Sequence, residues 1–152
     1  MFEKELKLIK ESKLFKPDLY LCSIFIFNNK TQFDFYSKKS KLVTSFIVED
    51  NEVNILNKEE KIFQKEKKDL EELRLEKVKI DLEKALERVG NSVKKHKETT
   101  TKQIIILQQN KFPLWNISSI TSSFNIINIK INAETGKILE EIKESILNFK
   151  RS

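Results

Sequence analysis

The sequence predicts an α+β fold in which antiparallel sheets are packed by helices, with two similar helix-strand-strand-strand units in tandem. Residues 124–132 alternate in hydrophobicity like a strand, and after a turn at Ala133–Gly136 the apolar residues of 138–149 recur at helical spacing. A fainter version of the same order precedes them, with an Asn-Lys turn ending at Lys30 in the first half and at Lys111 in the second. The match lies in pattern more than in identity, so duplication and chance are both open explanations.

This organisation divides the chain into three parts. We expect an N-terminal α+β repeat over residues 1–56, a charged helical connector over 57–80 and a C-terminal α+β repeat over 81–152. A chain of 152 residues has the usual size of one domain, or of two small ones that share a core, and needs no disulfides to fold. Half-apolar sheets and striped helices must each hide a face, so the helices are expected to cover the strands.

The first part is predicted to begin with a helix over about 2–14, which stops before Pro17 because the residue before a proline disfavours helical geometry. The segments that follow are apolar, β-prone and separated by turn residues, as expected of strands. The predicted strands are 19–27, 33–35, 42–48 and 53–56, with a turn at 28–30, a polar break at 37–41 and a turn at 49–52.

The connector has the pattern of a thinly buried helix over 57–75. Asn57 is suited to cap it, with Glu60 at the capping-box position. A second helix start is predicted at Asp81, because an apolar stripe follows it. That stripe comprises Leu82, Ala85, Leu86, Val89 and Val93. Whether a continuous helix or a short extended piece joins 57 to 81 is open.

The last part is predicted as three strands and a closing helix. The strands are 104–107, 114–121 and 124–132, with a loop at 99–101 and a turn at 110–111. Gly136 supplies the positive φ that the turn after the third strand requires. Leu139, Ile142, Ile146 and Phe149 then share one face of a predicted helix over 138–149.

The segment 132–138, Asn-Ala-Glu-Thr-Gly-Lys-Ile, resembles the closing signature of PepSY-like domains, in which Asp-Ala-x-Thr-Gly-x-Val/Ile ends the sheet. Residues 80–86 resemble the helix that opens such a domain, so the resemblance covers about 80–139, with a degenerate tandem copy at 2–56. The departure is Asn132, where the family has Asp. The resemblance implies a small α+β module that binds or restrains a partner, and it implies no catalysis.

Composition and charge limit the other function classes. The lone cysteine, Cys22, lies in an apolar run and is expected to be a buried thiol in a reducing compartment. The N-terminus lacks the apolar stretch of a secretory signal, and no segment reaches the ~18 apolar residues of a membrane span. We therefore expect a cytoplasmic protein without membrane contact. The net charge of +6 leaves room for an anionic partner.

The sequence contains no local motif that is typical of a catalytic site. Gly90 and Gly136 are the only glycines, which excludes a glycine-rich phosphate loop. His96 is the only histidine and stands at a predicted helix end, where a cation interacts favourably with the dipole. Asp34 lies between two phenylalanines of a strand, and alternation places it on the opposite face. We expect no enzyme, no cofactor and no metal site.

The predicted function is a non-enzymatic module that binds a protein or peptide or assembles with itself. Its expected surfaces are a strand edge at 112–115 that accepts an added strand, and the sparse helix of the connector. The residues expected to form them are Ile62, Phe63, Leu70, Leu73, Phe112 and Trp115. The alternative for both surfaces is that they are already covered within the monomer.

A small RNA- or DNA-binding protein is the alternative function. Two lysine clusters, one between strands and one at a helix end, would contact phosphates and make binding strongly salt-dependent. The residues concerned are Lys38, Lys39, Lys41, Lys94, Lys95 and Lys97.

Overall fold

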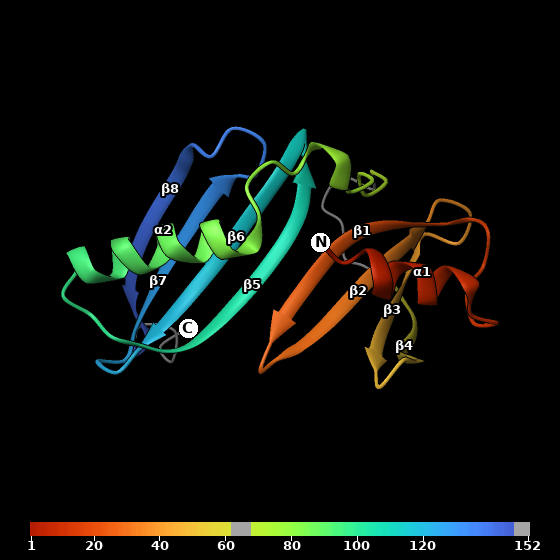
Figure 1. The fold of residues 1–152 in the computed structure, drawn as a ribbon, viewed down its shortest axis with the longest axis horizontal. Helices are drawn as coiled ribbons and strands as arrows, with labels where there is room; N and C mark the ends of the chain where they lie inside the picture. The colour runs from red at the N-terminus through yellow and green to blue at the C-terminus, as the bar shows by residue number, and fades with distance from the viewer. Residues whose placement is uncertain (62–67, 148–152) are drawn as a thin grey trace. The chain divides into compact units, whose positions relative to one another are not determined.

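The computed structural model describes residues 1–61 and 68–147. The chain divides into two compact units, Met1–Leu73 and Arg74–Ser152, which we call unit 1 and unit 2 and describe separately (Figure 1). Within these described residues, each unit contains one α-helix and four antiparallel strands in meander order. In unit 1 the strand order is β4-β3-β2-β1, and in unit 2 it is β5-β6-β7-β8.

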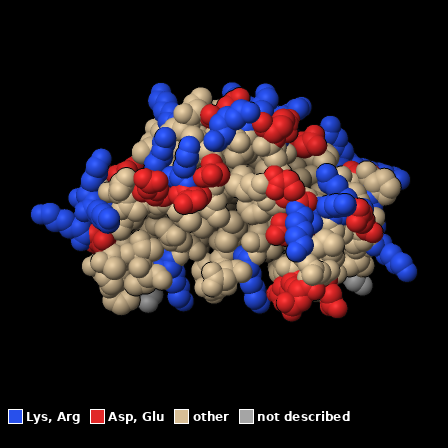
Figure 2. All heavy atoms as spheres, in the orientation of Figure 1, with Lys and Arg blue, Asp and Glu red and all other residues tan. Residues whose placement is uncertain are grey.

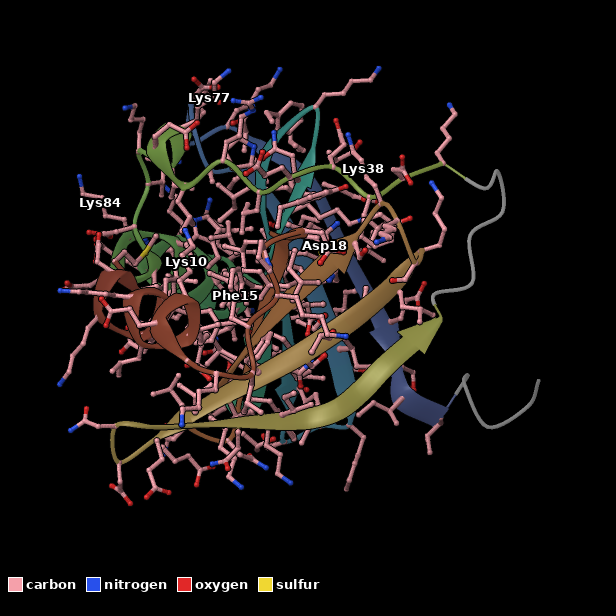
Figure 3. The ribbon with its side chains drawn as sticks, turned by 90° about the vertical axis from the view of Figure 1, so that its right-hand side faces the viewer. Lys10, Phe15, Asp18, Lys38, Lys77 and Lys84 are labelled. Carbon is pink, nitrogen blue, oxygen red and sulfur yellow. The ribbon has the colours of Figure 1, made fainter. Side chains whose placement is uncertain are left out.

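Unit 1 begins with helix α1, and its strands follow in sequence order. The elements are α1 (Glu3–Glu11), β1 (Leu19–Phe27), β2 (Lys30–Ser37), β3 (Leu42–Glu49) and β4 (Glu52–Lys61). α1 lies against one face of the sheet, where Phe33, Phe35 and Phe46 are fully buried. Phe15, labelled in Figure 3, belongs to the loop after α1. Its ring meets that of Phe35 edge-on, with centroids 5.3 Å apart. Aromatic packing thus forms the core of this small unit.

Unit 2 begins with a short 3₁₀ turn, η1 (Leu75–Lys77), before its helix. The remaining elements are α2 (Leu82–Lys95), β5 (Thr100–Asn110), β6 (Phe112–Thr121), β7 (Asn125–Asn132) and β8 (Ile138–Ser145). Asp81 caps α2 as predicted, because its Oδ1 accepts a hydrogen bond of 2.9 Å from the Lys84 amide. α2 crosses one face of the sheet and buries Ala85, Val89 and Val93.

The turn between β7 and β8 fixes the path of the last strand. Asn132 Oδ1 accepts hydrogen bonds from the Glu134 amide at 2.9 Å and the Thr135 amide at 3.1 Å. Gly136 has φ +85°, which confirms the predicted positive φ, and its amide donates to the Asn132 carbonyl at 2.7 Å. Arg88 of α2 donates to the Gly136 carbonyl. The helix is therefore tied to the turn by a side chain that approaches close to the glycine.

The predicted helix over 138–149 is wrong for the residues that the structure describes. Residues 138–145 form β8, which pairs with β7 from Asn125 opposite Ser145 to Ile131 opposite Ile138. The helical spacing of the apolar residues is real, but β7 offers a row of unpaired backbone groups that a strand can satisfy. Tertiary hydrogen bonding therefore overrides the local pattern.

The predicted connector helix is wrong as well. Residues 57–61 belong to β4, where Asn57 lies opposite Ser45 of β3 instead of capping a helix. Residues 68–74 contain no helix, and within the described stretch 68–81 the single turn η1 is the one helical element before α2. Residues 62–67 lie outside the described part of the chain.

The predicted fold class must be corrected accordingly. The structure is dominated by antiparallel strands, and one helix per unit covers one face of four strands. The prediction of a helix-packed α+β protein built from tandem helix-strand-strand-strand units is therefore wrong. The physical reason is that residues 57–61 and 138–145 complete the sheets, where backbone pairing satisfies more polar groups than isolated, thinly buried helices would.

Candidate functional site

The sheet of unit 2 has one face that α2 covers and one that it does not. Trp115, Ile117 and Ile129 lie on the covered face and are fully buried. Because side chains alternate along a strand, the residues between them point away from α2. Five of these outward residues are isoleucines that are half-buried or exposed, and we call them the isoleucine face. They are Ile104, Ile106, Ile120, Ile126 and Ile142.

Three hydrogen-bonded polar side chains lie among these isoleucines. Asn128 Nδ2 donates to Asn116 Oδ1 at 2.7 Å and to Ser118 Oγ at 2.9 Å. Strand pairing places an isoleucine opposite each of the three, with Ile142 opposite Asn128, Ile106 opposite Asn116 and Ile104 opposite Ser118. The isoleucine face is therefore an apolar surface with an ordered polar centre, and its side chains are positioned by a four-stranded sheet.

The edge strand β8 adds one isoleucine and two acidic residues to this face. Ile142, which is 39% exposed, lies opposite Asn128, while Glu140 lies opposite Lys130 and Glu144 opposite Ile126. The strand is held from the α2 side by Glu141, which accepts a hydrogen bond of 2.5 Å from Ser92 Oγ and lies 2.8 Å from His96 Nε2. The Ser92 hydrogen bond first, and His96 second, hold the pKa of Glu141 below its usual value. β8 is thus anchored to α2 on one face, and on the other it presents Ile142 between two glutamates, of which Glu140 pairs with Lys130 at 3.0 Å.

Unit 1 carries a polar group on the face opposite α1, which we call the Asp34 cluster: Asp34, Ser23, Gln32 and Ser45. Asp34 Oδ2 accepts from Ser23 Oγ at 3.0 Å, and its Oδ1 accepts from Gln32 Nε2 at 2.8 Å and from Ser45 Oγ at 2.6 Å. Strand pairing explains the group, since Asp34 lies opposite Ser23 on β1 and Ser45 on β3. The predicted orientation of Asp34 away from the Phe33 and Phe35 face is confirmed.

The same face of unit 1 is covered at one end by residues 69–73. Leu70 packs against a small core of Cys22, Tyr36 and Val43. Tyr36 donates its hydroxyl hydrogen to Asp69 Oδ1 at 2.9 Å, and the same oxygen pairs with Lys41. Cys22 is a buried thiol, as predicted, and burial raises its pKa to about 12.

The structure separates the residues predicted to form a partner interface. Leu73 is buried and its amide donates to the Leu21 carbonyl at 2.8 Å, while Leu70 is half-buried, so both pack within unit 1. Ile62 and Phe63 lie outside the described residues. Trp115 is fully buried and donates through Nε1 to the Ile80 carbonyl at 2.8 Å.

The strand edge predicted at 112–115 is also wrong. Phe112 begins β6, which pairs with β5 on one side and with β7 on the other. An interior strand has no free backbone groups with which to accept an added strand. In unit 2, the exposed edge belongs to β8 instead.

The two predicted lysine clusters lie in different units, and acidic residues accompany both. Lys41 pairs with Asp69, and Lys38 lies over the ring of Tyr20, 5.9 Å from its centroid. Lys39 contributes to the low pKa of Asp18, which is caused first by the hydrogen bond from Ser37. Asp18 and Lys38 lie at the same end of β1 and β2 (Figure 3).

The second cluster is at the end of α2. Lys94, Lys95 and Lys97 are exposed there, close in sequence to Glu98, and His96 between them forms the C-cap of the helix as predicted. On the face drawn in Figure 2, basic and acidic side chains are intermixed. A phosphate backbone would be met by both signs of charge on that face.

The described residues contain no group of three or more histidine, cysteine, aspartate or glutamate side chains placed to hold a metal ion. In the same residues, no helix is long and apolar enough to cross a membrane.

Sequence reasoning missed both the isoleucine face and the Asp34 cluster. The available signal for the first was the unbroken apolar run Ile104–Leu107, because a strand with one wet face alternates whereas this one is apolar on both faces. The Asp34 cluster has no local signal, since its four residues come from three strands that only the register brings together.

Comparisons with known proteins add a fold likeness. No family model matches the chain, and no curated protein matches it. A crystal structure of a "putative lipoprotein" from Clostridium difficile 630 is similar, with a TM-score of 0.60 over 92% of this chain and 90% of that chain, at 17% sequence identity. At this identity the similarity shows the fold alone. The description of that protein names no catalytic activity.

Proposed function

We propose that this chain is a non-enzymatic protein- or peptide-binding module and that the isoleucine face is its binding surface. One observation carries the proposal: the face of the unit 2 sheet that points away from α2 bears five isoleucines where an ordinary one-sided sheet bears polar residues. Contiguous apolar area of this kind marks an interaction surface more often than isolated exposed residues do.

The polar centre of the face favours binding of a specific partner over non-specific hydrophobic association. Protein interfaces combine an apolar area with a limited number of hydrogen bonds. Asn116 and Asn128 already hold each other in a fixed orientation, so a partner would meet ordered amide groups with little loss of side-chain freedom. At the sheet edge, the exposed Ile142 of β8 lies opposite Asn128 and adds to the contact.

The PepSY-like resemblance is part of the same proposal. The turn at 132–136 supports it, because Asn132 accepts the two amide hydrogen bonds that an Asp at this position would accept, and Gly136 has the backbone conformation that the Thr-Gly pair requires. The cytoplasmic location stays a prediction. The similar Clostridium difficile protein is described as a "putative lipoprotein", so the location of this chain needs a direct test.

A paired substitution tests the binding surface. Ile120 and Ile126 lie opposite each other on the isoleucine face, and changing both to Gln removes apolar area without adding charge. The matched control changes Lys84 and Glu87, exposed on α2, to Gln, which leaves the net charge unaltered. A partner isolated with the wild-type protein and then purified should bind the control normally in calorimetry and bind I120Q/I126Q at least tenfold more weakly.

Equal binding by both variants would rule out this surface. The nucleic-acid alternative is tested separately by mobility shift with generic RNA and DNA at low salt. Binding there that disappears with modest added salt, and that weakens when Lys94 and Lys95 become Gln, would favour the alternative.

A further inference from the structure

We propose that the Asp34 cluster binds a cationic side chain, lysine or arginine, presented by a protein partner. The inference deepens the proposed function and rests on it, because it names the chemistry that the partner brings to unit 1. It concerns the face of unit 1 that points away from α1, and residues with no part in the packing of that helix.

The carboxylate of Asp34 accepts hydrogen bonds from three neutral side chains. Ser23, Gln32 and Ser45 donate three hydrogen bonds of 2.6–3.0 Å to its two oxygens. Two carboxylate oxygens offer about four acceptor positions, so acceptor capacity remains after these three bonds. The carboxylate is thus fixed in position by uncharged groups, and it can accept a further hydrogen bond.

The residues beside Asp34 suit the stem of a long basic side chain. Gln32 lies opposite Phe25 on β1 and opposite Ile47 on β3, and both apolar residues are half-buried on the same face. Lysine and arginine bury their methylene stems on apolar surface while the charged end reaches a polar group. The ring of Phe25 adds a favourable surface for a cation.

The net charge of the chain distinguishes binding at this site from non-specific electrostatic attraction. The chain carries a net charge of +6, so non-specific binding favours acidic partners. A preference for basic side chains therefore requires a local feature such as the Asp34 cluster. Because the three donors already fix the rotamer of Asp34, binding a cation would cost little additional side-chain entropy.

Peptide selection tests the inference. A random peptide library would be selected on the full-length protein and, in parallel, on D34N. The matched control is D18N, which removes a carboxylate from the same unit but outside this face, where Asp18 accepts a hydrogen bond from Ser37. We expect lysine and arginine to be enriched by the wild type and by D18N, and the enrichment to be lost with D34N.

A second measurement cancels any effect of the substitution on folding. In an enriched peptide, the arginine is replaced by citrulline, which has the same shape without the charge. We expect this change to weaken binding to the wild type about tenfold and to leave binding to D34N unaltered. Enriched peptides without a basic preference, or an equal citrulline effect on both proteins, would overturn the cation site and leave the binding function standing. If no peptide is enriched on any protein, peptide binding itself fails as well.

Discussion

Gly136 connects the sequence signature to the stability of unit 2, and replacing it with Ala should be costly. Its φ of +85° is a conformation in which an L side chain costs about 1–2 kcal/mol. A Cβ built on this residue would lie 2.8 Å from Arg88 Nη1 and 3.2 Å from Arg88 Cζ. The guanidinium must therefore move away from the Gly136 carbonyl to which it donates.

The expected loss of stability follows from these two effects. A hydrogen bond from a charged donor contributes about 1.5–3 kcal/mol, and we take about 1 kcal/mol because Arg88 is largely exposed. Added to the backbone cost, this predicts that G136A lowers the free energy of unfolding by about 2–3 kcal/mol. In the chain's other glycine, Gly90 of α2, a Cβ would meet no atom within 4 Å. G90A should therefore stabilise the protein by about 0.5–1 kcal/mol through helix propensity.

Urea denaturation followed by circular dichroism measures both variants. The double variant R88A/G136A separates the two effects, because the Gly136 substitution should then cost only the backbone part, about 1–2 kcal/mol. A G136A protein within about 0.5 kcal/mol of the wild type would refute the role assigned to this turn. So would a loss of the same size in G90A, since that would reflect general intolerance of substitution.

Three further predictions concern unit 1. Burial raises the pKa of Cys22 to about 12, so this thiol should not react with a thiol reagent at pH 8 until the protein is unfolded. L70A should speed the reaction in native buffer, because Leu70 packs over the core that contains Cys22. Rapid labelling of the native wild type would contradict this. L73A should lower the free energy of unfolding of a monomer by about 2–4 kcal/mol, because Leu73 is buried. Urea titration measures the stability and light scattering the oligomeric state. An unchanged stability, or an oligomer that dissociates, would argue that Leu73 lies in an interface. The hydrogen bonds from Lys41 first, and Tyr36 second, lower the pKa of Asp69 in the folded protein. The ionised Asp69 therefore stabilises the fold above the unfolded pKa near 3.8, and this stabilisation is lost as pH falls through the lower folded pKa. D69N should therefore be less stable than the wild type at pH 7 and similar to it at strongly acidic pH, and a constant difference across the pH range would exclude this linkage.

Local patterns were sufficient where a segment makes its own structure. The strand at 19–27, the strand near 124–132 and the helix after Asp81 formed as predicted, because each combines a strong period with suitable turn or cap residues. The turn at Gly136 was predicted for the same reason. Boundaries shifted by a few residues, as for β7, which begins at Asn125.

Patterns failed where the neighbours of a segment decide. Residues 138–145 have apolar side chains at helical spacing, yet they form β8 because β7 offers unpaired backbone groups along their whole length. Trp115 was expected near an exposed edge, yet β6 has a partner strand on both sides. Neither outcome depends on the residues of the segment alone.

By itself, the sequence determined the strands with strong β patterns, the capped helix α2, the burial of Cys22 and the lack of any local catalytic motif. Only the tertiary structure decided that residues 57–61 and 138–145 are strands, that five isoleucines share an uncovered face and that Ser23, Gln32 and Ser45 meet at Asp34. The reason is that strand pairing is a long-range interaction, in which the register with a neighbouring strand fixes both the backbone partners and the face on which each side chain lies.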